Sequence, residues 1–243
     1  MNGGSMLGMQ LRVEQRIFWR NRSGMFFTFV LPLAMLFVLA MSDDPVDNVP
    51  LIAGLGILST GFQGLAIQLA MHRDQGVLKR VMATPLDAGT LILGKALSTL
   101  LVIAVEVAII VVAGVFIFGA DAPQHPLTLV GFVVLGTACF VSLGFAVASL
   151  IPTSESAPAI TNAAYLGLVL VTALLHNVDG LPDWVIDAGK VLPLENLVIP
   201  IQHAWTGGLD RGDAIGAVVL TAWAVVACAY SVRSFRWEPA GER

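Results

Sequence analysis

The chain has 243 residues, of which 56% are hydrophobic and only 12% are charged. An ordinary soluble domain is roughly 25% charged. A soluble core of this size could not bury so many apolar side chains. Disordered chains are polar and charge-rich, so disorder is also excluded. The 13 Lys and Arg against 17 Asp and Glu disfavour nucleic-acid binding, because phosphate recognition needs a basic surface. The composition predicts an all-α polytopic membrane protein.

The first element in the chain is a basic segment over residues 7–22. Its apolar and basic side chains lie on different faces of a helix, although Glu14 intrudes on the apolar side. We expect an interfacial helix on the cytoplasmic leaflet, with Trp19 at the depth of the lipid headgroups. The alternative is a solvated basic tail. The apolar residues are Leu7, Leu11 and Phe18, and the basic residues are Arg12, Arg16 and Arg20.

Six apolar runs follow, each long enough to cross a bilayer, which takes about 20 residues. Charged residues, Pro or Gly bound each run. The predicted spans are about 25–41, 51–71, 91–118, 127–151, 159–176 and 214–232, and they form one transmembrane domain over residues 1–243. No soluble domain of useful size is expected, so any ATPase machinery would come from another chain.

The distribution of positive charge predicts the orientation of these spans. With both ends of the chain in the cytoplasm, every Lys and Arg lies inside except Lys190 and Arg211. The reverse orientation would invert this strong bias. We therefore expect six transmembrane helices with an N-in, C-in topology.

The segment 181–205, on the predicted outer side, does not span. It holds two short apolar runs separated at Pro193, and neither is long enough to cross. We expect two re-entrant half-helices before the last span, since irregular backbone is tolerated at membrane depth where protein covers it. The alternative is an ordinary outer loop with surface helices.

Three polar side chains inside the predicted spans are candidates for a substrate pathway. Glu106 lies near the middle of the run Ala96–Phe118, where a charge costs about 2.5–3.5 kcal/mol on insertion scales. It is expected to face the protein interior, either in a cavity or proton-linked site or as a protonated carboxyl bonded to Gln63, Gln68 or Thr137. Gln63 and Gln68 are either glue between helices or the lining of a polar route.

One stretch nearly matches a phosphate-binding loop, and we reject it. The run Gly89–Lys95 has the spacing of GxxxxGK, but Ala96 stands where the loop needs Ser or Thr for Mg²⁺. No strand precedes it and a membrane helix follows. Lys95 is instead expected to extend its charge to the cytoplasmic headgroups. We expect no nucleotide cofactor and no metal bound by this chain.

The loop between the second and third spans carries a short amphipathic helix. Val77, Leu78, Val81 and Met82 fall on one face, with charged residues around them, and Pro85 ends the helix. An apolar ridge with a charged rim fits a docking surface for a soluble partner. A helix lying on the membrane is the alternative.

These loop residues resemble a known family. Asp74-x-Gly76-x-Leu78-Lys79-Arg80, followed by Thr84-Pro85-Leu86, is similar to the loop of ABC-2 type transporter permeases, in which Glu is commoner than Asp at the first position. The resemblance extends to the N-terminal helix, the six spans and the outer half-helices. Leu181-Pro-x-Trp184 and Pro193-x-Glu195-Asn196 fit the outer pattern loosely.

The resemblance implies a mechanism and partners. Two permease chains, identical or sibling, would pair in a bacterial plasma membrane and dock ABC ATPase subunits, which bind ATP and Mg²⁺. ATP-driven closure would open an export pathway for a hydrophobic or amphipathic substrate such as a drug, antibiotic or lipid-like molecule. The implied coupling residues are Arg73, Asp74, Gln75, Gly76, Val77, Leu78, Lys79, Arg80, Thr84 and Pro85. Candidate pathway residues are Phe26, Phe62, Gln63, Gln68, Glu106 and Tyr165.

Other functions stay open at this point. A proton-coupled secondary transporter would use Glu106, although the inverted repeats typical of that class are not evident. A polysaccharide or lipid-linked glycan exporter shares the architecture that the resemblance implies. A scaffold that only anchors an ATPase would show docking without transport.

Overall fold

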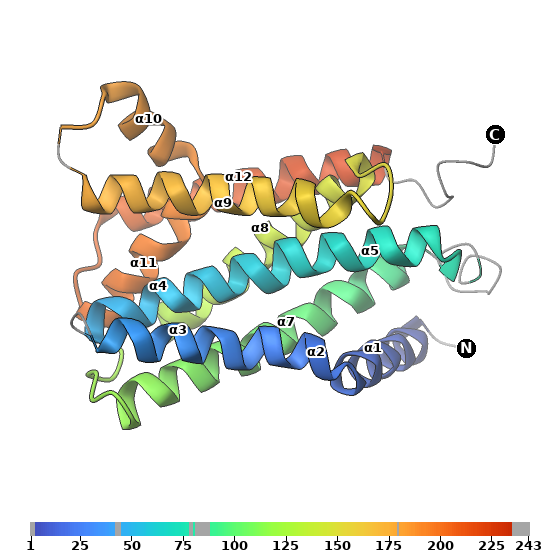
Figure 1. Ribbon diagram of the computed structural model, residues 1–243, viewed down its shortest axis with the longest axis horizontal. Coiled ribbons are helices and arrows are strands. Elements are labelled where there is room, and N and C mark those ends of the chain that lie inside the picture. The colour runs from blue at the N-terminus through green and yellow to red at the C-terminus, as the bar shows by residue number, and fades with distance from the viewer. Residues whose placement is uncertain (1–2, 42–44, 78–79, 81–87, 179, 235–243) are drawn as a thin grey trace.

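The computed structural model describes residues 3–41, 45–77, 80, 88–178 and 180–234. Helices make up most of this part of the chain, and no strand occurs in it. Figure 1 shows the long helices running side by side. The elements are α1 (Gly3–Arg20), α2 (Arg22–Met25), η1 (Phe26–Val30), α3 (Leu31–Ala40), α4 (Pro45–Leu58), η2 (Ser59–Gly64), α5 (Leu65–Asp74), α7 (Ala88–Phe116), α8 (Pro126–Leu150), α9 (Ala157–Asn177), α10 (Asp183–Val191), α11 (Glu195–Thr206) and α12 (Arg211–Ser234).

Within the described residues, six helical segments are long and apolar enough to cross a membrane, as predicted. The first two spans are each interrupted by a π-helical segment: α2–η1–α3 forms the first, and α4–η2–α5 forms the second. π-Helical turns are rare and occur frequently at functional sites, because their wider turn leaves local hydrogen bonding irregular. The interruptions were not visible in the sequence.

The two ends of the bundle differ in what covers them. Helix α1 lies across the bundle at the end where α5 terminates and α7 begins, and α10 and α11 lie at the opposite end (Figure 1). The start of α1 and the end of α12 therefore share one end, which an even number of crossings requires. The topology across a real membrane stays a prediction.

Two short helices flank Pro193, at the break predicted from the sequence. Helix α11 packs against α4, α8 and α12 and buries Leu197, Ile201 and Trp205 in the main core. Helix α10 packs against α9 and is largely exposed. How deep the pair enters a membrane stays a prediction.

The core depends on close helix contacts that small residues allow. A Cβ atom on Gly144 of α8 would lie 2.9 Å from the main-chain oxygen of Gly61 in η2. Only glycine lets α8 approach the backbone of η2 this closely. The contact holds the second span against the fourth, and so positions one wall of the cleft described below.

Candidate functional site

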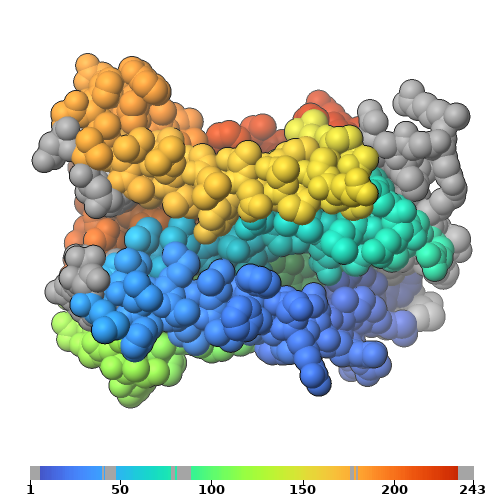
Figure 2. Space-filling model, viewed as in Figure 1, coloured from blue at the N-terminus to red at the C-terminus, as the bar shows by residue number. Residues whose placement is uncertain are grey.

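A cleft of about 620 Å³ opens between the first and second spans. Both π-helical segments line it, η1 with Phe27 and Thr28 and η2 with Ser59, Thr60 and Gln63. Helices α1, α5 and α7 supply most of the remaining lining, with Gly24 of α2 and Leu31 of α3. In Figure 2 the surface is hollowed between the dark blue N-terminal helices and the cyan second span. The volume of the cleft lies in the range of small-molecule sites.

Of the predicted pathway residues, Gln63 and Gln68 line this cleft. The Gln63 amide also donates a hydrogen bond to the Asn162 Oδ1 of α9, at the exposed surface of two spans. Phe62 is only 3% exposed and belongs to the core. Phe26 is exposed, and its ring and that of Phe27 make a T-shaped contact.

Glu106 lies behind the cleft wall rather than on it. Its side chain is 1% exposed, and its Oε2 accepts a hydrogen bond of 2.8 Å from Thr60 Oγ1. The expected interior position is confirmed, but the partner is not one of those predicted, because Gln63 faces Asn162 and Thr137 donates to the carbonyl of its own helix at Val133. Tyr165, on α9, is partly buried and packs against the main core.

The second oxygen of Glu106 has no hydrogen-bond partner among the described residues. It fills a notch beside Gly56, where a Cβ atom would lie 2.6 Å from it. No Lys, Arg or His in the described part of the chain forms an ion pair with this carboxyl. A buried carboxyl without full compensation is costly, so it is a functional-site candidate.

The Thr60 hydroxyl is unusual among the helical hydroxyls. Thr99, Thr137 and Ser231, for example, donate to the carbonyl four residues earlier in their own helix, the common arrangement inside helices. Thr60 instead donates across to α7. Its hydroxyl therefore links the cleft wall to the buried carboxyl.

At the end of the cleft nearest α1, a buried ion pair joins α1 to α7. Lys95 Nζ lies 2.9 Å from Glu14 Oε2, and these side chains are 5% and 10% exposed. The prediction that Lys95 extends to the headgroups is therefore wrong, because the charge turns inward to Glu14. Gln15 adds hydrogen bonds of 3.0 Å to the main-chain oxygen and the hydroxyl of Ser98.

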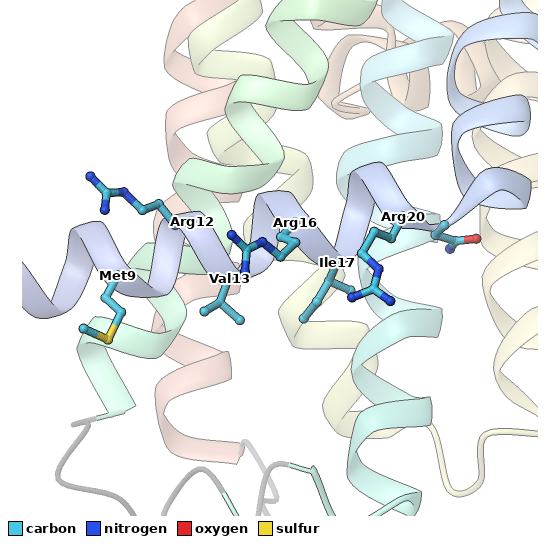
Figure 3. Close-up of a pocket in the computed structure, with 7 residues that line it drawn as sticks. Met9, Arg12, Val13, Arg16, Ile17 and Arg20 are labelled. Atoms are coloured by element: carbon cyan, nitrogen blue, oxygen red, sulfur yellow. The ribbon is translucent and has the colours of Figure 1, made fainter.

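This ion pair also corrects the orientation of α1. Leu7, Leu11 and Phe18, expected to face the membrane, are half-buried. The exposed apolar stripe is a different one, formed by Met9, Val13 and Ile17. Figure 3 shows these three side chains along one face of α1, beside the row of Arg12, Arg16 and Arg20. Both charged residues stand out in the sequence, because Glu14 lies among apolar residues and Lys95 lies in an apolar run. Pairing the two would have predicted the contact between α1 and α7.

The last turn of α5 is tied firmly to the end of α8. Arg73 is 4% exposed and donates to the carbonyl oxygens of Ala148 (3.2 Å), Ile151 (2.7 Å) and Pro152 (3.2 Å). A guanidinium is well suited to the unpaired carbonyls at a helix C-terminus. Asp74 accepts a hydrogen bond of 2.5 Å from the main-chain N–H of Ser154. Arg73 thus faces the bundle, not the solvent.

Beyond this anchor the chain turns outward. Gly76 has φ +67°, a left-handed conformation that glycine adopts without strain, and it ends α5. Gln75 and Arg80 are exposed, and Arg80 donates to the Gln75 carbonyl. Val77 is half-buried. Four of the predicted coupling residues, Leu78, Lys79, Thr84 and Pro85, lie outside the described residues.

A polar cluster at the opposite end was missed by sequence reasoning. His203 Nδ1 lies 2.9 Å from Asp213 Oδ1, and Asp210 lies close to both side chains. Asp210 accepts from the N–H groups of Gly212 and Asp213, while Asp213 accepts from the N–H of Asp210. This reciprocal arrangement caps the start of α12, which accounts for both carboxylates.

Comparison with known families agrees with this architecture. The sequence pattern of the family described as ABC-2 type transporter matches residues 9–201, from α1 into α11. No curated protein is detectably similar to the chain. The family constitutes the transmembrane component of its transporters and not the ATPase, and six apolar helices agree with a multi-pass membrane protein. The chain therefore belongs to the ABC-2 type transporter family, as a membrane-spanning permease component.

Proposed function

We propose that the chain is the permease subunit of an ATP-driven exporter in a bacterial plasma membrane. It pairs with a second permease chain, identical or sibling, and docks separate ATPase subunits that bind ATP and Mg²⁺. The transported substrate is hydrophobic or amphipathic, in the class of drugs, antibiotics or lipid-like molecules. Membership of the ABC-2 family supports the permease role.

The observation that best supports ATPase coupling is the anchor formed by Arg73 and Asp74. A rigid contact is needed if force on an exposed loop is to move buried helices, since packed elements move as units. The anchor connects the end of α5, where the loop begins, to the carbonyls at the end of α8 and to Ser154, ahead of α9. A push on the loop would therefore reach three spans at once.

The buried ion pair of Glu14 and Lys95 would transmit motion from the ATPase by a second route, through α1. Glu14, Gln15 and Lys95 hold α1 against α7 through buried charged and polar contacts. The exposed coupling residues Gln75 and Arg80, with the half-buried Gly76 and Val77 and the loop positions beyond them, would form the surface that an ATPase contacts. Arg73 positions that surface and does not belong to it.

The polar pair of Gln63 and Asn162 supports a second permease chain. Both side chains lie within predicted spans, and Asn162 is exposed. Amide groups facing lipid are unfavourable unless protein covers them. A partner chain over this surface would remove them from lipid. The cleft, lined by apolar and polar side chains that include His72, with one ion pair at its end, suits an amphipathic substrate.

The first test is co-purification of the tagged full-length chain from its native membrane, with ATP hydrolysis measured on the product. We expect an ATPase to co-purify and Leu78→Asp to release it while the chain still inserts. Leu209→Asp is the matched control, because it places the same change at an exposed position at the other end of the bundle. Retention of the ATPase by Leu78→Asp would contradict the assignment of the loop.

The direction and energy source need a transport assay. Inverted vesicles containing the complex should accumulate substrate when ATP is added outside, and dissipating the proton gradient should not stop them. Accumulation that needs only a proton gradient, and that Glu106→Gln abolishes, would instead favour the secondary transporter. The observation that favours the secondary transporter is the buried carboxyl of Glu106.

A further inference from the structure

We propose that the cleft between η1 and η2 selects amphiphiles that carry a protonated amine, and that the Glu106 carboxyl supplies this preference through the hydroxyl of Thr60. The proposal rests on the proposed function for the cleft as a substrate site, and it assigns the chemical class that this site takes.

The argument begins with the Thr60 hydroxyl, which lies on the cleft wall. Thr60 lines the cleft and donates its only hydroxyl proton to Glu106 Oε2, at 2.8 Å. A hydroxyl that donates still has lone pairs to accept with. The hydrogen-bond direction therefore leaves an acceptor, and not a donor, available to a molecule in the cleft. A ligand must bring its own donor to use it.

The charges around the cleft favour a cationic donor over a neutral one. Lys95 and Glu14 both line the cleft, but they are 2.9 Å apart and neutralise each other. Glu106 has no such counter-charge among the described residues, and its Oε1 is unpartnered there. A cation at Thr60 would favour the ionised carboxyl and be attracted by it in a poorly solvated setting.

The remaining surface of the cleft fits the apolar part of such a molecule. Phe27, Leu31 and Val102 line it, together with Gln63 and Gln68. The cleft thus combines an apolar wall for a ring or chain with one negatively biased position for a charged head. A volume of about 620 Å³ holds a molecule of drug size.

The experiment compares two fluorescent probes that differ only in charge. Monodansylcadaverine carries a primary amine, and its N-acetyl derivative is neutral but otherwise similar. Both are titrated into lipid nanodiscs holding the full-length chain with its co-purifying partners, and empty nanodiscs give the lipid background. We expect the amine to bind the protein about tenfold more tightly than the neutral probe.

Three variants locate the source of that preference. Glu106→Gln removes the ionisable carboxyl and should abolish the preference while leaving affinity for the neutral probe near the wild-type value. Thr60→Val removes the hydroxyl and should weaken the preference. Thr99→Val is the matched control, because Thr99 also lines the cleft but donates its hydroxyl proton to the main-chain oxygen of Lys95. This variant should keep the wild-type preference for the amine probe.

Three results would overturn the proposal: equal binding of the two probes by the wild type, binding of neither probe, or a preference that survives Glu106→Gln. The test is separate from that of the proposed function, because binding is measured without ATP. A chain that shows the amine preference but has no ATPase partner would refute the ABC exporter assignment and leave the cleft proposal standing.

Discussion

Removal of one partner of the buried Glu14–Lys95 pair should release α1 from α7. The side chains are 10% and 5% exposed and 2.9 Å apart. Breaking a buried ion pair typically costs about 3–5 kcal/mol, because one charge stays buried without compensation. We take about 3 kcal/mol for Lys95→Met, since Gln10 still donates a hydrogen bond to Glu14 Oε1.

The assay is amide hydrogen exchange in α1, which reports local opening of a helix from the bundle. A loss of about 3 kcal/mol corresponds to about 150-fold faster exchange, at roughly 1.4 kcal/mol per factor of ten. Arg12→Met is the control, because it removes an exposed cation from the same helix. It should change α1 exchange little.

The double variant decides whether the charge pair is the cause. Glu14→Gln combined with Lys95→Met leaves no buried charge at this position, so it should recover much of the protection that Lys95→Met alone loses. If the double variant exchanges as fast as the single variant, the docking of α1 does not depend on this pair. Unchanged exchange in Lys95→Met would refute the reasoning outright.

Three further predictions concern other contacts of the second span. Gly76→Ala should lower local stability by about 1–2 kcal/mol, because φ is +67°. Gly76→Pro should separate ATP hydrolysis from transport without preventing insertion. Unchanged transport in Gly76→Pro would contradict a coupling role. Arg73→Met should lower thermal stability by about 2–4 kcal/mol, because three main-chain carbonyls near the end of α8 lose their donor; a melting temperature equal to the wild type would disprove the anchor. Gly56→Ala should cost about 1–3 kcal/mol by overpacking against Glu106, whereas Gly131→Ala, with open space around it, should be tolerated in the same melting assay.

Much of the architecture was predictable, because membrane insertion depends on local composition. Each predicted span coincides with a long apolar helix, and the break near Pro193 separates two short helices. Both features depend on run length, hydrophobicity and proline chemistry, which can be read along the chain. The family resemblance carried by the loop after Asp74 agrees with the family match over residues 9–201.

The side-chain partners were less predictable, because they join residues far apart in the chain. Glu106 was expected inside the protein, yet the partner Thr60 depends on how α7 crosses η2. Lys95 was expected at the headgroups, yet Glu14 lies within 2.9 Å of it. A single charged residue in an apolar run shows that compensation is needed but does not say where it comes from.

The sequence by itself therefore determined the class of the molecule, a helical membrane protein with six spans and a basic N-terminal helix, because burial in lipid acts on each segment separately. Tertiary structure alone decided that the first two spans contain π-helical turns, that these turns border one cleft, and that the Glu106 carboxyl lies behind it. Those features arise from helix crossings, where a glycine notch or a threonine hydroxyl meets a residue from a distant segment. Such crossings are set by packing between helices and not by the composition of either one.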